Sequence, residues 1–109
     1  EDDHGKTSLF YACESGNESI VNYLVEHGAN INKVDEYGET PLLKACFKNK
    51  ENIMKCLVEL GADINKEDHH GKTPLFYACQ NGNETIVKYL LEHGANVNKE
   101  DENGKTPLS

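Results

Sequence analysis

The chain has 109 residues, 37% of them hydrophobic, and a formal net charge of -8. Its 19 acidic residues outnumber its 11 basic ones, which argues against nucleic acid as a partner, because a phosphate backbone is bound by a basic face. The apolar runs are too short to cross a membrane, no signal peptide opens the sequence, and the missing initial Met indicates a piece of a longer chain.

A period of 33 residues runs through the whole sequence. Aspartates and glycines mark it, at Asp2, Asp35, Asp68 and Asp101 and at Gly5, Gly38, Gly71 and Gly104. The period predicts complete units at residues 2–34, 35–67 and 68–100, with the start of a fourth unit at 101–109. The first and third units are identical at 24 of 33 positions, and the second and third at 17. A fixed period of this length is typical of stacked units that bury each other's apolar faces.

Each unit is predicted to open with a short helix that begins at a Thr-Pro pair. Thr40 and Thr73 place a capping hydroxyl directly before a proline, a residue that suits the first turn of a helix. The equivalent pair in the first unit, Thr7-Ser8, lacks the proline, so we expect the first corner to be the weakest. The end of this helix needs a residue that tolerates a left-handed backbone. We assign that place to Gly16, Asn49 and Gly82.

A second helix is predicted in each unit, because an apolar stripe recurs there at helical spacing. In the third unit the stripe comprises Ile86, Val87, Leu90 and Leu91. Asn17 and Asn83 are predicted to cap the start of this helix, so we expect their glycosylation sequons to remain unmodified. Glycines are predicted to close the helix, at Gly28, Gly61 and Gly94. Helices this short are unstable in isolation, so stacking must hold them.

The residues at the turns resemble those of the ankyrin repeat. The resemblance is carried by Gly-Glu-Thr-Pro-Leu at 38–42, Gly-Lys-Thr-Pro-Leu at 71–75 and Gly-Ala-Asn-Val-Asn at 94–98, and it covers essentially the whole chain. It implies an all-α solenoid of stacked helix-turn-helix units with β-hairpin-like finger loops. The chain departs from the family pattern where His and a second Ala are usual, at Phe10, Leu43 and Phe76 and at Cys13, Cys46 and Cys79. We expect neither departure to disturb the fold.

The four cysteines are interpreted as packing residues with free thiols. Cys13, Cys46 and Cys79 occupy equivalent positions, which stacked helices would hold roughly 10 Å apart. A disulfide needs Cα atoms within about 7 Å of each other, so these three cannot pair. Cys56 stands where the other units have tyrosine, which is also a packing position. Reduced cysteines favour an intracellular protein.

No metal site is predicted. The sequence contains no Cys-x-x-Cys spacing, which a zinc site would favour. Equivalent histidines two units apart, such as His4 and His70, would lie roughly 20 Å from each other, too far to share one ion. His69 and His70 are neighbours on one finger, and we interpret them as solvated imidazoles.

No catalytic or cofactor-binding arrangement is predicted either. Acidic residues recur with the period, as Asp35 and Asp68 or Glu59 and Glu92 do, and we interpret them as solvated faces. An active site is normally a single place, whereas these acids repeat along the chain. No glycine-rich phosphate loop is present. We therefore expect no enzyme activity and no cofactor.

The resemblance implies that the fingers and the exposed side of the first helices form one concave face that binds partners. The candidate residues on it are Asp3, His4, Lys6, Glu14, Ser15, Glu36, Tyr37, Glu39, Phe47, Lys48, His69, His70, Lys72, Gln80 and Asn81. Tyr37 and Phe47 are predicted anchors, because aromatic residues are enriched at binding hot spots. The alternative for Phe47 is packing against Leu43 or Tyr77. We expect a partner surface of mixed or basic charge.

The sequence thus favours a scaffold or recognition module for a protein partner. One alternative is a structural spacer whose concave face contacts nothing, and another is an adaptor domain of a larger enzyme or channel. The first unit keeps its apolar residues and the fourth is incomplete, so both ends of the stack should expose apolar surface. Such ends predict fraying at the termini and end-to-end self-association.

Overall fold

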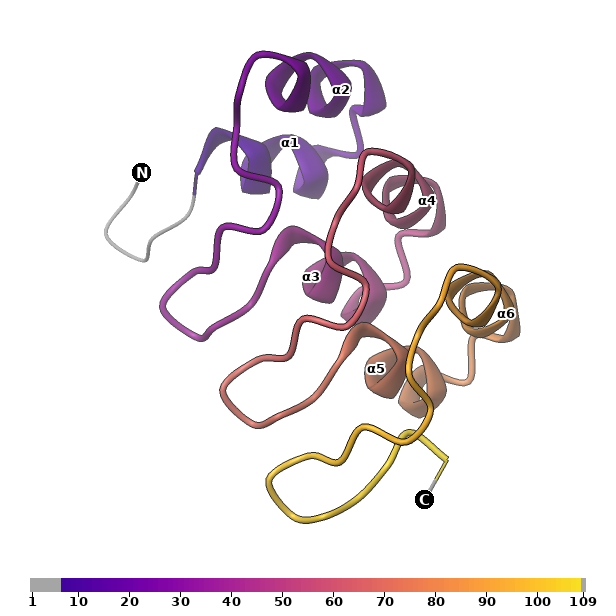
Figure 1. The fold of residues 1–109 in the computed structure, drawn as a ribbon. Coiled ribbons are helices and arrows are strands. Elements are labelled where there is room, and N and C mark those ends of the chain that lie inside the picture. Colours follow the sequence, from indigo (N-terminus) through magenta and orange to yellow (C-terminus); the bar gives the residue numbers. More distant parts are fainter. Residues whose placement is uncertain (1–6, 109) are drawn as a thin grey trace.

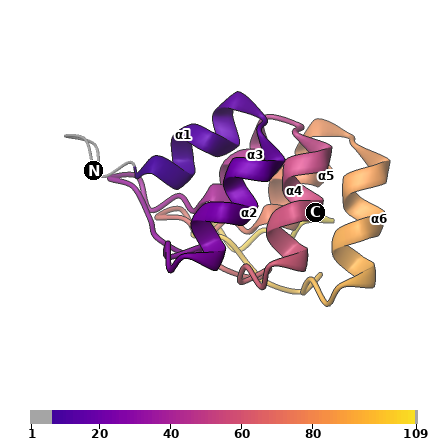
Figure 2. The ribbon, with the colours of Figure 1, turned by 90° about the horizontal axis from the view of Figure 1, so that it is seen from above.

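The computed structural model describes residues 7–108, and within that range it contains α-helices and no β-strand. The helices are α1 (Ser8–Ser15), α2 (Glu18–Glu26), α3 (Pro41–Phe47), α4 (Glu51–Glu59), α5 (Pro74–Asn81) and α6 (Glu84–Glu92). They form antiparallel pairs that stack with α1, α3 and α5 in an inner row and α2, α4 and α6 in an outer row (Figure 1). Seen from above, successive pairs overlap with a sideways shift (Figure 2). The predicted all-α solenoid is confirmed.

The inner helices begin at threonines, as the sequence predicts. Thr40 Oγ1 accepts a hydrogen bond from the N–H of Leu43 at 3.2 Å, and Thr73 Oγ1 accepts one from the N–H of Phe76 at 3.4 Å. Thr7 makes no such bond, and its buried hydroxyl has no partner among residues 7–108. The first corner therefore lacks both the proline and the capping hydrogen bond of the other two.

The predicted helix ends are also confirmed. Gly16, Asn49 and Gly82 have φ angles of 77°, 59° and 68°, in the left-handed region that the first turn after each inner helix requires. Asn17 and Asn83 cap α2 and α6, each accepting a hydrogen bond at 3.1 Å from the backbone N–H three residues ahead. Each outer helix ends two residues before its predicted glycine, and these glycines have φ angles of 98° to 99°.

Polar side chains tie each unit to the next. Lys50 takes the capping position of α4 without capping it, and its Nζ instead donates to the carbonyl oxygen of Glu14 at the end of α1, at 3.0 Å. In the loops, Asn32 Oδ1 accepts a hydrogen bond from the N–H of Asp63 at 2.9 Å. Asn65 repeats this contact one unit later. These bonds satisfy backbone groups that the short helices and loops leave open.

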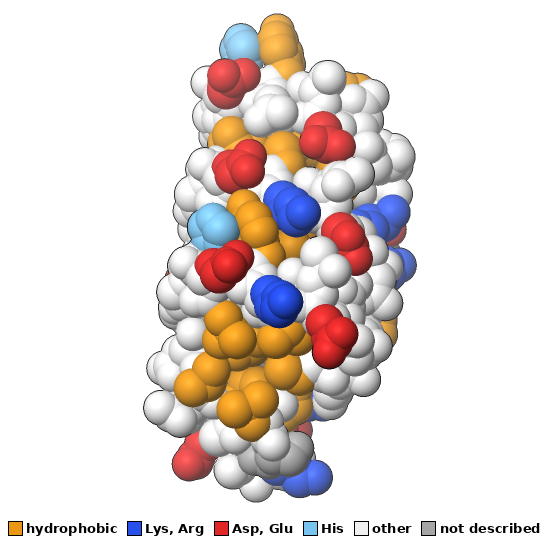
Figure 3. All heavy atoms as spheres, turned by 90° about the vertical axis from the view of Figure 1, so that its right-hand side faces the viewer, with side chains coloured by type: hydrophobic (Ala, Val, Ile, Leu, Met, Phe, Trp, Pro, Cys, Tyr) orange, Lys and Arg blue, Asp and Glu red, His pale blue; other side chains and the backbone are white. Residues whose placement is uncertain are grey.

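The core is a continuous layer between successive helix pairs, and it is open at both ends. Val21 and Met54 are fully buried by the pair that follows them, whereas the equivalent Val87 in the last pair is half-buried. At the other end Ile20 is 47% exposed, although the equivalent Ile53 is 3% exposed. Figure 3 views the side of the stack that lies on the right in Figure 1, and hydrophobic side chains gather there toward the lower, C-terminal end. The expected apolar ends are therefore present, while end-to-end association remains a prediction.

We expect Gly82→Val to lower the free energy of unfolding by about 1 to 2 kcal/mol, because a β-branched residue is strained in the left-handed region. A Cβ atom at Gly82 would meet no other atom within 4 Å, so the cost comes from the backbone alone. Lys66→Val, in an exposed loop, is the control and should change stability by less than about 0.5 kcal/mol. Urea unfolding measures both, and equal midpoints would contradict the helix boundaries.

Candidate partner-binding face

A buried aspartate organises each finger within residues 7–108. Asp35 is 5% exposed, and its Oδ1 accepts hydrogen bonds from the backbone N–H groups of Tyr37, at 2.9 Å, and Glu39, at 3.0 Å. Asp68 and Asp101 make the same pair of bonds in the next two fingers. The interpretation of Asp35 and Asp68 as solvated acids is therefore wrong. The tight turn points two N–H groups inward, and the aspartate at its start satisfies both.

The recurring acids thus fall into two groups. Glu59 and Glu92 are exposed on the outer helices, as the sequence predicts. The finger aspartates are structural, and at Asp101 the N–H donated by Lys105 holds the pKa of the carboxyl below its usual range. Within residues 7–108, no group of three His, Cys, Asp or Glu side chains could hold a metal ion.

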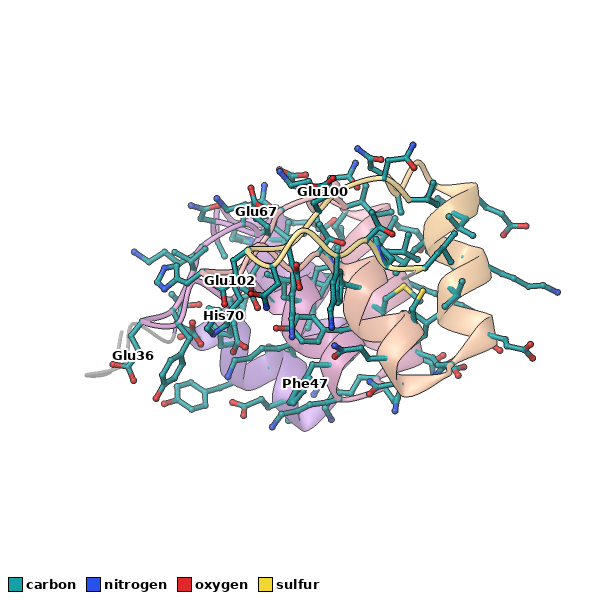
Figure 4. All side chains as sticks on the ribbon, turned by 90° about the horizontal axis from the view of Figure 1, so that it is seen from below. Glu36, Phe47, Glu67, His70, Glu100 and Glu102 are labelled. Atoms are coloured by element: carbon teal, nitrogen blue, oxygen red, sulfur yellow. The ribbon has the colours of Figure 1, made fainter. Side chains whose placement is uncertain are left out.

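Adjacent fingers pack directly on each other and form the outer edge of the concave face. Gly38, at a φ of 76°, lies against the imidazole of His69, so a side chain there would collide with the next finger. The N–H of Glu102 donates to the carbonyl oxygen of His70 at 2.9 Å, and the side chains of these two residues meet at 3.0 Å. Figure 4 shows His70 beside Glu102, and Glu36 at the finger tips. The fingers are therefore one connected edge that can present side chains in a fixed arrangement.

A second contact joins each finger to its inner helix. The Tyr77 hydroxyl donates to the Asp68 carboxylate, and burial together with this bond raises the pKa of Tyr77. In the middle unit Lys44 takes the place of tyrosine, and its Nζ lies 3.6 Å from Asp35 Oδ2 and 3.7 Å from Glu39 Oε1. Burial, followed by the nearby Asp35 charge, raises the pKa of Glu39. The sequence does not predict these contacts, because their partners are five to nine residues apart and join a finger to a helix.

Replacing Tyr77 by Phe removes the donor to the buried Asp68 carboxylate and keeps the ring. We expect Tyr77→Phe to lower the free energy of unfolding by about 1 to 3 kcal/mol, because Asp68 then keeps an unpaired buried oxygen. Tyr23→Phe is the matched control, since Tyr23 is 61% exposed and should change stability by less than about 0.5 kcal/mol. Chemical denaturation compares the two, and the finger contact is unimportant if both variants match the parent.

The two predicted anchors are exposed on opposite sides of the concave face. Tyr37 is 59% exposed at a finger tip, and Phe47 is 54% exposed at the end of α3. Phe47 also packs edge-to-face on Tyr77, with ring centroids 5.4 Å apart. Packing on Tyr77 therefore fixes the Phe47 ring without covering it. The predicted anchor role of Phe47 and its packing on Tyr77 are compatible. In Figure 4 Phe47 lies on the inner-helix side, away from Glu36 at the finger tips.

The structure brings most of the other candidates to this face but gives some of them internal roles. Lys48 and Gln80 are exposed, whereas Lys72 is half-buried, with its Nζ 5.8 Å from the Tyr77 ring centroid. The amide of Asn81 donates to the carbonyl oxygens of Cys46, at 3.1 Å, and Phe47, at 2.9 Å, so it holds the end of α3. His4, Lys6 and Asp3 lie outside the described residues.

Sequence reasoning missed Tyr11, which is 50% exposed on α1. Its equivalent Tyr77 is 9% exposed because Phe47 packs on it, and identity between the first and third units concealed the difference. The residue that covers a tyrosine at this position lies in the inner helix of the preceding unit, as Phe47 of α3 does for Tyr77 of α5. The sequence of the preceding unit therefore carries the signal.

The cysteines are free thiols, as expected. Cys13, Cys46 and Cys56 are buried, and Cys79 is half-buried at the open end of the stack. Burial raises the pKa of the Cys13 and Cys46 thiols to about 12. They remain protonated at neutral pH and therefore act as small apolar residues instead of nucleophiles.

These two thiols predict a loss of stability at alkaline pH. Their pKa in the folded chain exceeds the value of about 8.5 of an unfolded thiol, so the unfolded chain loses protons first as pH rises. The two thiols therefore make their full contribution to the free energy of unfolding below about pH 8.5. Above that pH the free energy of unfolding falls by up to about 1.4 kcal/mol per pH unit for each thiol. Urea unfolding from about pH 8 to about pH 10 measures the fall, which should be shallower in Cys13→Ala/Cys46→Ala. Equal slopes would contradict the pKa assignment.

A model of the family described as ankyrin repeats (3 copies) matches residues 1–68 and 66–109. The chain therefore belongs to the ankyrin repeat family, which is typically non-enzymatic and generally serves as a protein–protein interaction module. No curated protein matches the sequence. Among the helices of residues 7–108, none is long and apolar enough to cross a bilayer.

Proposed function

We propose that this chain is a non-catalytic recognition module that binds a protein partner across its concave face. The observation that carries the proposal is the pair of large aromatic side chains on that face, Tyr37 and Phe47, each more than half exposed. Exposed aromatic side chains held in place are the usual hot spots of protein interfaces. Phe47 is held by Tyr77, and Tyr37 stands on a finger whose backbone is fixed by Asp35.

The stacked units support this function because they present the two anchors without a large loss of conformational freedom on binding. Adjacent fingers are bonded to each other, Asn81 bonds α5 to the end of α3, and Lys50 bonds the start of α4 to α1. A preorganised surface keeps more of its contact energy as affinity. The buried protonated thiols agree with an intracellular location, which we include in the proposal.

Apolar side chains exposed on the first and last described helix pairs favour a second candidate function, which is association with another copy of this chain. Leu91, in the last helix pair, is 43% exposed, and Ile20, in the first, is 47% exposed. Apolar surfaces of this kind often mark contact sites between copies. The alternatives to recognition are a structural spacer and an adaptor domain of a larger enzyme or channel. A recognition module binds its partner through the concave face, whereas the concave face of a spacer contacts nothing.

Affinity capture from a lysate of the source cells tests the proposal. A protein bound to the parent chain should be lost with Tyr37→Ala/Phe47→Ala, because each anchor contributes about 2 kcal/mol, roughly a 30-fold change in affinity. Tyr23→Ala, an equally exposed aromatic change on the outer helix α2, should retain the partner. Thermal unfolding confirms that each variant is folded. Equal recovery with every variant would favour a spacer.

A further inference from the structure

The groove between the outer helices α4 and α6 is filled by a tyrosine. Tyr89 belongs to α6, and the ammonium nitrogen of Lys55, on α4, lies 5.7 Å from the centroid of its ring. Burial, followed by the nearby charge of Glu59, raises the pKa of Tyr89. This groove therefore already holds an aromatic ring, a cation over the ring and a carboxylate beside it.

The groove between α2 and α4 lacks both the ring and the cation. Cys56 stands at the position equivalent to Tyr89, and Asn22 stands at the position equivalent to Lys55. Cys56 is 7% exposed, and its thiol donates to Asn22 Oδ1 at 3.8 Å, so these two side chains meet at the base of the groove. A hollow of about 360 Å³ is left above them, with Glu18, Asn52, Lys55, Glu59 and Leu60 around it.

Carboxylates outnumber cations around this hollow. Burial raises the pKa of the Cys56 thiol, and the charges of Glu18 and Glu59 raise it further, which places both carboxylates near the thiol. Both glutamates are exposed, and neither forms an ion pair with another residue of the 7–108 range. Among the described residues that line the hollow, Lys55 is the one cation, and its ammonium group leans over the Tyr89 ring.

The charges farther from the hollow do not reverse this balance. Lys50 and Glu51 border an adjoining hollow beside Glu18, and their opposite charges offset each other. The outer helices together carry six glutamates and two lysines. Figure 3 shows acidic side chains along the whole height of that side of the stack. The groove between α2 and α4 therefore favours a cation.

Among cationic side chains, arginine matches this hollow better than lysine does. Its planar guanidinium group binds carboxylates through parallel hydrogen bonds and also stacks on flat or apolar surfaces. It would thus supply both the flat group that Cys56 lacks and the charge that Asn22 lacks. Arginine has five N–H donors, and the amide oxygens of Asn22 and Asn52 are acceptors for those that the carboxylates do not bind.

We propose that the groove between α2 and α4 binds an arginine side chain of a protein partner. Glu18 and Glu59 bind the guanidinium group, and Leu60 contacts the apolar stem of the arginine. The outer helices lie on the other side of the inner row from the fingers (Figure 1). This second binding surface is therefore separate from the concave face, and the proposal does not depend on the proposed function.

Short blocked peptides test the chemistry of the groove. The probes are acetylated, amidated Gly-Arg-Gly, Gly-Lys-Gly and Gly-citrulline-Gly, titrated into the full ¹⁵N-labelled chain at low salt. Gly-Arg-Gly should shift the backbone amide signals of Asn22, Asn52 and Cys56 in a saturable way. Citrulline keeps the planar shape without the charge and should shift none of them. Equal binding of the lysine peptide, or equal shifts along all three outer helices, would overturn the proposal.

Two variants that copy the filled groove should close the hollow. Cys56→Tyr introduces the ring found at Tyr89, and Asn22→Lys introduces the cation found at Lys55. Each should abolish the saturable shifts caused by Gly-Arg-Gly, and thermal unfolding checks that each variant is folded. Asn22 is only half-buried, so Asn22→Lys preserves the test if Cys56→Tyr does not fold. Unchanged affinity in folded Asn22→Lys would contradict the proposal.

A pair of matched charge variants locates the carboxylates that bind. Glu18→Gln should weaken Gly-Arg-Gly binding roughly fivefold, because it removes one exposed ionic partner of the guanidinium group. Glu84 occupies the same first-turn position in α6 as Glu18 does in α2, so Glu84→Gln is the control and should leave the affinity unaltered. Equal weakening by both variants would show a general charge effect and no groove site.

The concave-face variant separates this proposal from the proposed function. Tyr37→Ala/Phe47→Ala removes both anchors of the concave face and should leave the binding of Gly-Arg-Gly unchanged. Loss of peptide binding in this folded variant would place the arginine on the concave face and overturn the proposal.

Discussion

Each helix pair in this chain has apolar residues on both of its stacking sides and no core of its own, so its stability comes from contact with the pairs beside it. Val21 and Met54 show this directly, since both are fully buried only because another pair follows them. Val87, at the same position in the last described pair, remains half-buried. The short helices, of seven to nine residues, would not persist alone, and their capping residues fix where they begin rather than whether they form.

The concave face follows from this stacking, because regular spacing brings one finger and one inner helix from every unit to the same side. The side chains at equivalent positions then determine what each part of the face can bind. Tyr77 meets Asp68 through a hydrogen bond, whereas Lys44 meets Asp35 through an ion pair, so the same backbone carries different chemistry in neighbouring units. Partner recognition in such a chain depends on the differences between units, and stability depends on what they share.

The sequence predicts local features well and contacts between units poorly. Gly82, Asn49 and Asn83 could be placed because a capping or left-handed position needs a particular residue within a few positions of a helix end. Asp35 was misread because its burial depends on how a five-residue turn orients its N–H groups, which periodicity does not reveal. The internal role of Asn81 was not predictable, since its amide donates to carbonyl groups 34 and 35 residues away.

The alternation of two kinds of unit has a consequence for any longer array with the same pattern. The first and third units are more alike than either is to the second, which is what duplication of a two-unit block produces. An array of such blocks would carry the equivalents of Tyr37 and Phe47 once per block, about 20 Å apart. A partner with binding segments at matching intervals would then bind through avidity, since each occupied pair of aromatic side chains raises the effective concentration at the next pair.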